Sequence, residues 1–488
     1  MYGGEVLNAH LILRYGLTKE FFETFRSVTF SRIELPLLMV LEYYKYIQPI
    51  VDKNISNRKY RRQKRYPFKS MKDVQRVLFR SPPPIKKLDR NKERKAILMP
   101  AAFLPLALKH LKKDHVILIV STKKDTLLLQ KYKLPSNFEV FYIGKEMKSI
   151  EISNKRRGRM EKIIREICLE NKTHEVFGTP SFQEWLIKKS LKVMKEMKLL
   201  KGLIRQKPIG LILHHAELSS TGGALSLLAL RYELPFINVQ YNLTTDVSII
   251  PSRASQYCVW GNHSQNWLMS KGIPKTKIHK VGSLRFEIEN NTTKVKRQDL
   301  MKELKIPTNH QIVLWTTQPF PEEINRLILQ WIKMSIKDRP FTVIIKPHPN
   351  DKLDYRNLIN GADQNILLPT NYELYDLLVN ADYCMTVSSN TAVEAATENK
   401  GIFVLQPPMK YDFFQNYNGY HEHLVKANAG VVIKNERNMK HLLKELAVNP
   451  QYQKSLIKKS QQFALETVDQ RGNATDRICQ LIRTLQAN

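Results

Sequence analysis

Short apolar segments alternate with amphipathic segments along most of the chain beyond residue 90. In the first half they predict strands at 95–101, 115–122, 137–144, 208–215 and 254–262, with a further strand that ends at Gln240. The segments between them have helical spacing, and a long cationic helical region covers about 150–207. Short apolar strands separated by helices are typical of a parallel sheet that is covered on both faces.

The same alternation begins again at residue 310, with strands predicted at 310–318, 341–346, 383–389 and 401–406. Two such series predict an α/β protein with two Rossmann-like, doubly wound domains that face each other across a cleft. Such sheets bind ligands at the carboxyl ends of their strands. The predicted parts are a basic helical N-terminal extension (1–90), a first Rossmann-like domain (91–285), a second one (286–430) and C-terminal helices that pack back on the body (431–488).

Charge narrows the class of partner. The chain has 78 Lys and Arg against 45 Asp and Glu, a formal net charge of +33. This excess favours nucleic acid, an anionic membrane face, or phosphate-rich substrates and polymers. The four cysteines form no CxxC or Cys/His cluster, so we expect reduced thiols and no zinc site. Without a recognisable signal peptide or spanning helix, the sequence predicts a cytoplasmic protein.

The extension contains one concentrated run of positive charge, NRKYRRQKRY at residues 57–66. The simplest interpretation of such a run is a solvated surface. An alternative is contact with an anionic membrane or polymer, and the interleaved tyrosines also suit single-stranded nucleic acid. The sequence leaves these interpretations open.

The motif KPHPND, residues 346–351, directly follows a predicted strand of the second domain. It places His348 between two prolines, which stiffen the backbone on both sides of the imidazole. Lys346 adds a compact cation at the end of the strand. Both side chains suit a contact with an anionic ligand.

A second polar motif, VSSNTAVEAA, follows the next long strand of the same domain. The polar residues at its turn and first helical turn are Ser388, Ser389, Asn390 and Thr391. Exposed amides at such a helix start bind phosphate. Glu394, further along the helix, would reach a ribose hydroxyl or complete a capping box. Together the two motifs predict a site for a nucleotide diphosphate, where His348 stabilises the charge of the leaving nucleotide.

The segments VIIKPHPND and 367–408 resemble the donor-binding half of GT-B-fold transferases that build bacterial surface polymers. The resemblance points to the CDP-glycerol glycerophosphotransferases of teichoic acid synthesis and to capsule polysaccharide transferases. Residues 258–287 are similar to their interdomain segment, and the whole resemblance covers roughly 208–425. It implies a GT-B fold, an acceptor-binding first domain and a nucleotide-donor-binding second domain.

The resembled family has a histidine base in a QHG-like turn of the first domain, where this chain has Gln240, Tyr241 and Asn242. Two histidines, His214 and His215, end the preceding strand of the same sheet, and Glu217 follows them. An imidazole near its ordinary pKa of about 6.5 is a suitable base for a hydroxyl nucleophile. We therefore expect catalysis by His214, His215 and Glu217, with Tyr241 a poorer candidate.

These observations predict a transferase that moves a sugar or a polyol phosphate from a nucleotide-activated donor to a polymer. The donor is a nucleotide sugar or resembles CDP-glycerol, and the acceptor is a cell-surface or spore-coat polysaccharide, a teichoic-acid-like chain or a lipid-linked acceptor. No DxD-like pair follows a strand near the motifs, so we expect no metal and no cofactor. The basic excess would hold the protein near the anionic inner membrane face or an anionic acceptor.

The sequence also allows other functions. A sugar-nucleotide 2-epimerase has the same two-domain fold, but it is expected to show an acidic cluster in the first domain and a double glutamate in the TAVEAA helix. This sequence shows neither feature. A non-catalytic protein that binds nucleotide or polyanion would explain the altered QYN turn. A nucleic-acid enzyme is disfavoured because the cations are spread over the chain. A nucleotide contact from Tyr411 or Asp412 is a minor alternative within the transferase prediction.

Overall fold

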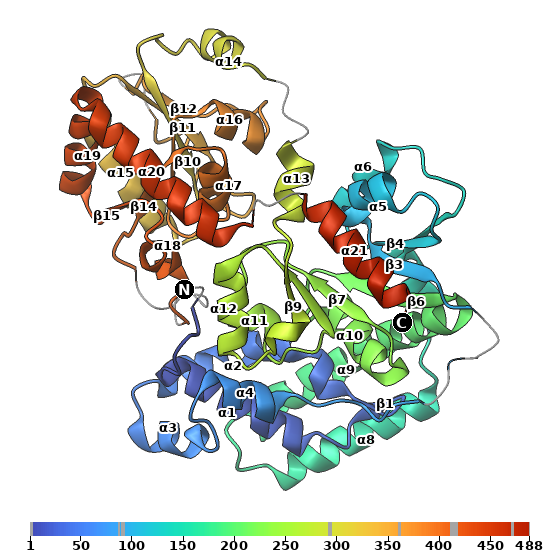
Figure 1. The fold of residues 1–488 in the computed structure, drawn as a ribbon. Helices are drawn as coiled ribbons and strands as arrows, with labels where there is room; N and C mark the ends of the chain where they lie inside the picture. The colour runs from blue at the N-terminus through green and yellow to red at the C-terminus, as the bar shows by residue number, and fades with distance from the viewer. Residues whose placement is uncertain are drawn as a thin grey trace. The chain divides into compact units, whose positions relative to one another are not determined.

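The computed structural model describes residues 3–85, 88, 93–290, 295–359, 363–409, 418–469 and 473–487. The chain forms two compact units (Figure 1). The N-terminal unit consists of Gly4–Val259, Gln265–Val281 and Gly472–Asn488, and the C-terminal unit of Met1–Gly3, Trp260–Ser264 and Gly282–Arg471. The sequence predicted the change of domain after residue 285. Tyr411 and Asp412 lie outside the described residues.

A seven-stranded parallel sheet forms the centre of the N-terminal unit, in the order β5-β4-β3-β6-β7-β8-β9. Its strands are β3 (Ala96–Pro100), β4 (Val116–Val120), β5 (Phe138–Tyr142), β6 (Ile209–His214), β7 (Phe236–Val239), β8 (Gln256–Val259) and β9 (Ile278–Lys280). From β3 the chain adds strands on one side, and from β6 it adds them on the other. The order of the strands therefore reverses between β3 and β6, the point at which such sheets bind ligands.

Helices flank this sheet. They are α5 (Leu104–His110), α6 (Lys123–Gln130), α7 (Ile143–Glu146), α8 (Asn154–Glu170), α9 (Pro180–Gln206), α10 (Ser220–Tyr232), α11 (Asp246–Ile249), α12 (Asn262–Ser270) and α21 (Ala474–Ala487), with short 3-10 helices η2 (Ala101–Phe103), η3 (Met147–Ser149) and η4 (Lys275–Lys277). The final helix, α21, packs against α5 and β6, and Lys109 Nζ donates to Thr475 Oγ1 (3.1 Å). Arg483 Nη2 also donates to Asp114 Oδ2 (2.7 Å).

The N-terminal extension is helical and belongs to the N-terminal unit. It contains α1 (Ala9–Thr24), β1 (Thr29–Phe30), β2 (Ile33–Glu34), η1 (Leu35–Leu38), α2 (Val40–Asn54), α3 (Arg58–Arg65) and α4 (Met71–Leu78). Its aromatic side chains pack on one another and on the segment before α9. The Phe21 and Tyr43 rings stack at 4.2 Å, and Phe25 lies edge-on to Phe177 at 5.1 Å. Aromatic burial of this kind anchors the extension to the sheet domain.

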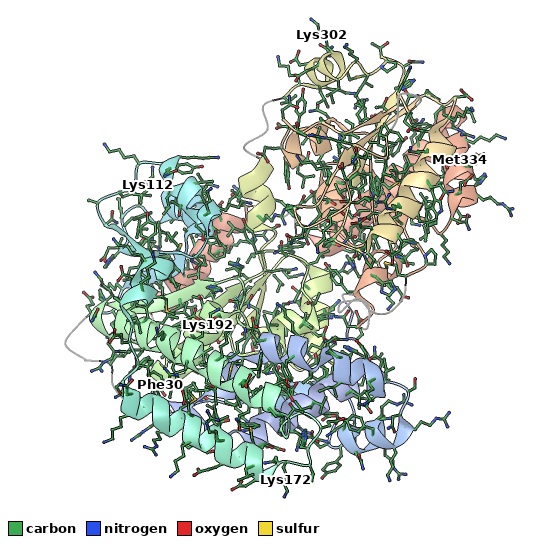
Figure 2. The ribbon with its side chains drawn as sticks, turned by 180° about the vertical axis from the view of Figure 1, so that it is seen from behind. Phe30, Lys112, Lys172, Lys192, Lys302 and Met334 are labelled. Carbon is green, nitrogen blue, oxygen red and sulfur yellow. The ribbon has the colours of Figure 1, made fainter. Side chains whose placement is uncertain are left out.

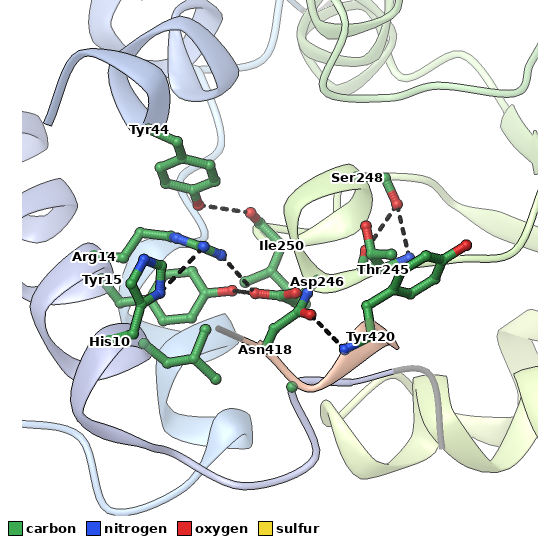
Figure 3. A network of polar contacts seen from close by, with 12 residues as sticks. His10, Arg14, Tyr15, Tyr44, Thr245, Asp246, Ser248, Ile250, Asn418 and Tyr420 are labelled. Carbon is green, nitrogen blue, oxygen red and sulfur yellow. Dashed lines mark hydrogen bonds and ion pairs between the residues drawn. The ribbon is translucent and has the colours of Figure 1, made fainter. Parts of the chain in front are cut away.

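A buried ion pair also holds the extension (Figure 3). Arg14 of α1 pairs with Asp246 of α11 at 3.1 Å, and both side chains are almost completely buried. The Tyr15 hydroxyl donates to Asp246 Oδ2 (2.6 Å), and the Tyr44 hydroxyl donates to the backbone oxygen of Ile250 (3.1 Å). Burial raises the pKa of Tyr15 well above its ordinary value. The hydroxyl therefore stays a donor, and the Asp246 charge is compensated from two residues of one helix turn.

A six-stranded parallel sheet forms the centre of the C-terminal unit, in the order β12-β11-β10-β13-β14-β15. Its strands are β10 (Gln311–Thr316), β11 (Phe341–Lys346), β12 (Ile366–Leu367), β13 (Tyr383–Thr386), β14 (Gly401–Leu405) and β15 (Val431–Ile433). Its helices are α13 (Leu284–Asn290), α14 (Arg297–Glu303), α15 (Glu322–Ile336), α16 (Leu374–Asn380), α17 (Thr391–Thr397), η6 (Tyr420–Glu422), α18 (His423–Lys426), α19 (Glu436–Val448) and α20 (Pro450–Thr467). Here the strand order reverses between β10 and β13. The structure confirms the predicted α/β class with two Rossmann-like sheets and a helical extension.

Positive side chains are spread over the surface of both units, as Lys112, Lys172, Lys192 and Lys302 illustrate (Figure 2). None of the described helices is both long enough and apolar enough to span a membrane.

Candidate functional site

Polar side chains connect the carboxyl ends of β10 and β13, where the strand order of the C-terminal sheet reverses. Gln318 Nε2 donates to Ser388 Oγ (3.0 Å), and the Ser388 amide donates to Gln318 Oε1 (2.7 Å). The hydroxyls of Thr316 and Thr391 are hydrogen-bonded at 2.7 Å. Both Ser388 and Thr391 are buried, so these two predicted ligand residues hold the loop in place. Ser389, which is half-buried, is the hydroxyl of the motif that a ligand can reach.

His348 lies on the other side of β10, after β11. Its amide donates to Thr317 Oγ1 (2.9 Å), and its Nδ1 accepts from the Asn350 amide (3.1 Å). Because Nδ1 is an acceptor, the neutral ring carries its proton on Nε2. Burial lowers the pKa of His348 below its ordinary value, although the nearby Asp351 opposes this. The imidazole is thus a neutral Nε2–H donor at pH 7.

Asp351, the last residue of KPHPND, organises this edge of the sheet. Its Oδ2 accepts from the hydroxyl of Thr317 (2.5 Å), the side-chain amide of Asn325 (3.1 Å) and the hydroxyl of Tyr355 (2.8 Å). Thr317 in turn accepts from the His348 amide, so Asp351 fixes the histidine loop through one intermediate side chain. No role was predicted for Thr317, Gln318 or Asp351, although Thr317 and Gln318 end the predicted strand 310–318 and Asp351 ends the motif after the strand 341–346.

Two other predicted donor-site residues have structural partners. Lys346 Nζ donates to the backbone oxygen of Tyr372, which ties β11 to the segment before α16. Glu394 is fully buried and pairs with Arg285 of α13 at 3.1 Å. The residue that caps α17 is Asn390, so Glu394 does not complete the predicted capping box. A ribose contact from this buried carboxylate stays a prediction.

The helix that follows Ser388 is short. α17 has 7 residues, and the side chain of its cap residue, Asn390, makes no capping hydrogen bond to the first turn. The Ser389 hydroxyl instead accepts from the Thr391 amide at 3.3 Å. Because α17 has so few aligned peptide units, its dipole is small, and anion binding by its first amides stays a prediction. Individual hydrogen-bond donors, chiefly the His348 imidazole and the Ser389 hydroxyl, are better candidates for binding an anion.

In the N-terminal unit, His215 lies beside the point where the strand order reverses. It follows β6, and its ring contacts Phe103 at the end of η2 (5.9 Å between centroids) and Tyr241 after β7 (5.6 Å). In the described structure no group bonds to its buried Nδ1. Burial lowers the pKa of His215 below its ordinary value, with Asp125 opposing the shift. The neutral ring therefore keeps a lone pair at pH 7, as a proton acceptor requires.

His214 and Glu217 have structural roles. The His214 ring stacks on His215 at 4.9 Å, and its Nδ1 accepts from the Ala216 amide (3.0 Å). Burial lowers the pKa of His214 to about 3, so this residue is a poor base. Glu217 is fully buried and accepts from the amides of Arg253 (2.9 Å) and Ala254 (2.8 Å). Of the three predicted catalytic residues, His215 is the one that the geometry favours.

Two further carboxylates near this edge are also engaged. Glu196 of α9 is buried and accepts hydrogen bonds from the hydroxyls of Ser220 and Thr221 (2.6 Å for Thr221) at the start of α10. Asp125 accepts from the Thr122 amide (2.8 Å) in the capping box of α6. Among the described residues, no three His, Cys, Asp or Glu side chains gather as a metal site requires. Metal-independent chemistry stays a prediction.

Glu217→Gln is expected to weaken the pH dependence of stability. Burial raises the pKa of Glu217 to about 7 from an ordinary 4.5, against the opposing amide donors. With a raised pKa in the folded state, the protonated carboxyl stabilises the fold fully below about pH 4.5, and the contribution is lost as pH rises through 7. From pH 5 to pH 8 the free energy of unfolding, measured by urea titration, should fall in both proteins. The fall should be about 2–3 kcal/mol smaller in the variant than in the wild type. Parallel curves would refute the raised pKa.

Known proteins of similar structure bear on the fold. No family model matches the chain, and no curated protein matches it. The S. aureus MnaA–UDP co-structure is similar over 80% of this chain and 96% of that chain, with 16% identity and a TM-score of 0.51. A putative UDP-N-acetylglucosamine 2-epimerase from Listeria monocytogenes is similar over the same shares, with 14% identity and a TM-score of 0.53. The chain has a GT-B fold.

The predicted GT-B fold is therefore confirmed. The wall teichoic acid polymerase TagF is also similar, over 91% of this chain and 98% of that chain, but with 11% identity and a TM-score of 0.47. The last value is too low to support an argument, and identities of this size establish the fold alone.

Proposed function

We propose that the protein is a transferase that moves a sugar or a polyol phosphate from a nucleotide-activated donor to an acceptor hydroxyl. One observation carries the proposal: each sheet has a chemically suited histidine after a strand that borders the reversal of strand order or lies next to a bordering strand. In the C-terminal unit this residue is the N–H donor His348, and in the N-terminal unit it is the proton acceptor His215. Ligands bind α/β sheets at such reversals.

The proposal assigns donor binding to the C-terminal unit. The His348 Nε2–H and the Ser389 hydroxyl would donate to the diphosphate. The bond between Gln318 and Ser388 and the bond between Thr317 and Asp351 keep the two loops in place. Fixed donors of this kind stabilise negative charge as it develops on the leaving nucleotide, without a cost of reorganisation. The UDP in the S. aureus MnaA co-structure supports a nucleotide ligand for this fold. Lys346 and Glu394 would support the two loops through their bonds to Tyr372 and Arg285.

Acceptor activation falls to His215 in the N-terminal unit. A neutral imidazole accepts the proton of a hydroxyl as that oxygen attacks, and the three nearby carboxylates are already engaged. By this proposal the donor is a nucleotide sugar or is similar to CDP-glycerol. The acceptor is a surface polymer or a lipid-linked chain that the protein modifies from the cytoplasmic side.

Loss of donor binding in His348→Ala tests the donor site. Wild-type protein should show a rise in melting temperature with at least one of CDP-glycerol and UDP-, CMP- or GDP-sugars, because a ligand of the native state raises apparent stability. His348→Ala should lose most of that rise, while its melting temperature without ligand should equal that of the wild type. His310→Ala is the matched control, since His310 precedes β10 at the opposite edge and bonds to Thr342 Oγ1 (3.0 Å). An equal rise in wild type and His348→Ala would exclude the assigned donor site.

A sugar-nucleotide 2-epimerase is the second candidate. The Listeria monocytogenes structure, a putative UDP-N-acetylglucosamine 2-epimerase, favours it through the shared fold. Against it stand the engaged carboxylates Glu196, Glu217 and Asp125, where an acidic cluster was expected. Nuclear magnetic resonance of UDP-GlcNAc incubated with the protein distinguishes the two. A new epimer without an acceptor supports the epimerase, and nucleotide release that depends on an acceptor supports the transferase.

A further inference from the structure

The helix α3 carries the most concentrated positive charge of the N-terminal extension, and the proposed transferase chemistry does not use it. Its eight residues, Arg58–Arg65, contain no acidic side chain. Arg58, Arg62 and Arg65 are exposed, and their spacing of four and three residues places them on one stripe of the helix. Lys59 of the same helix and Lys69, four residues after it, are also exposed. We call these five cations, together with Tyr66, the basic face.

The opposite side of α3 is fixed to the body of the unit. Lys64 is buried, donates to Glu20 Oε1 of α1 (2.6 Å), and lies over the Tyr60 ring at 5.0 Å. Gly16 of α1 allows this close approach, since a Cβ there would lie 2.7 Å from the Lys64 backbone oxygen. The helix therefore presents the basic face from a rigid support.

In the described part of the chain, no ion pair joins any of the five cations of the basic face to an acidic side chain. The comparable helix α8 differs in this respect, because Arg157 pairs with Glu161 (2.8 Å) and Lys162 with Glu166 (3.8 Å) along its own surface. The charge of α8 is thus partly neutralised within the helix, whereas that of α3 is available to an external anion.

Aromatic exposure indicates the kind of anion. Tyr66, directly after α3, is 82% exposed, one of the most exposed large apolar side chains described. Tyr60 is turned inward under Lys64, so the two tyrosines cannot form a stacking platform for successive bases. A single amphipathic ring beside several cations instead matches the interface of an anionic bilayer, where tyrosine rings lie at the level of the headgroups.

We propose that the basic face of α3 docks the protein on an anionic lipid membrane. The arginine stripe faces the lipid phosphates, and the Tyr66 ring enters the headgroup layer. Docking of this kind is peripheral and needs no spanning segment. It is independent of the donor and acceptor sites, so it holds or fails apart from the proposed transferase activity.

Vesicle flotation with the full chain tests the proposal. Wild-type protein should bind phosphatidylcholine vesicles that contain phosphatidylglycerol, should not bind phosphatidylcholine alone, and should be released by high salt. Combined Arg58→Glu, Arg62→Glu and Arg65→Glu should lower binding at least about tenfold. Tyr66→Ser should cause a smaller loss. The matched control combines Lys155→Glu, Arg159→Glu and Arg165→Glu, three exposed cations of α8, and should bind like the wild type.

Unchanged melting temperatures would show that both triple variants fold. Equal losses in the two triple variants would mean that net charge alone drives binding, and would overturn the assignment to α3. Equal binding of the wild-type protein to vesicles with and without phosphatidylglycerol would overturn the assignment as well. So would preferential binding of a labelled single-stranded oligonucleotide that only the α3 variant loses, because the basic face would then belong to nucleic acid.

Discussion

His215→Asn is expected to lower transfer by about 10²–10⁴-fold, the usual contribution of a positioned general base. Asparagine keeps a polar side chain after β6 but cannot take up a proton. Donor binding should survive, because the residues proposed to bind the donor lie in the C-terminal unit. The measurement is nucleotide release from the donor found by thermal shift, with an isolated cell-envelope fraction as acceptor. Since burial lowers the pKa of His215, wild-type activity should decline only below the pH range of an ordinary histidine.

Tyr241→Phe is the matched control for this experiment. The Tyr241 ring contacts His215 at 5.6 Å and shares its surroundings, so the phenylalanine ring preserves packing and removes the hydroxyl alone. Retained activity in Tyr241→Phe together with loss in His215→Asn identifies the imidazole as the base. The reverse result would transfer that role to the phenol, and activity in both variants would exclude each of them.

Asp246→Ala is expected to lower the free energy of unfolding by about 3–5 kcal/mol, as for other buried pairs from which one partner is removed. The substitution leaves the Arg14 guanidinium buried without its counter-charge and the Tyr15 hydroxyl without its acceptor. Urea unfolding followed by far-ultraviolet circular dichroism measures the change. If the alanine variant does not fold, Asp246→Asn, which keeps an acceptor for Tyr15, should fold with a smaller loss.

The exposed pair of Lys19 and Glu23 in the same helix is the comparison. Glu23→Ala should cost less than about 1 kcal/mol, because water and salt screen such pairs. Similar small losses at Asp246 and Glu23 would show that the extension is not held by its buried charge.

Most of the sheet structure could be predicted from the sequence because parallel strands are short, apolar and separated by helices. The segment 341–346 coincides with β11, and 95–101 contains β3. The helical region predicted at 150–207 consists of two helices, since Pro180 begins α9 with Thr179 as its cap. That proline could have predicted the break between the two helices. The order of the strands could not be predicted, because periodicity does not record which strands become neighbours.

The candidate site was harder to predict, since a polar residue after a strand can point inward or outward. Ser388, Thr391 and Glu217 turned out to be buried and bonded, whereas Ser389 and His215 are partly accessible. Sequence spacing places neighbouring residues on opposite sides of the segment, yet it does not say which side is exposed to solvent. The roles of Gln318 and Asp351 depend on contacts over tens of residues, and these follow from the tertiary fold alone.

The final helix affects the order in which the chain can fold during translation. α21 covers α5 and β6 of the N-terminal unit, but its residues 474–487 are made after the whole C-terminal sheet. Domains usually fold as units in the order in which they leave the ribosome. In this chain the unit that emerges first must wait for the segment that emerges last, so the nascent N-terminal sheet stays partly uncovered while the second domain is being synthesised.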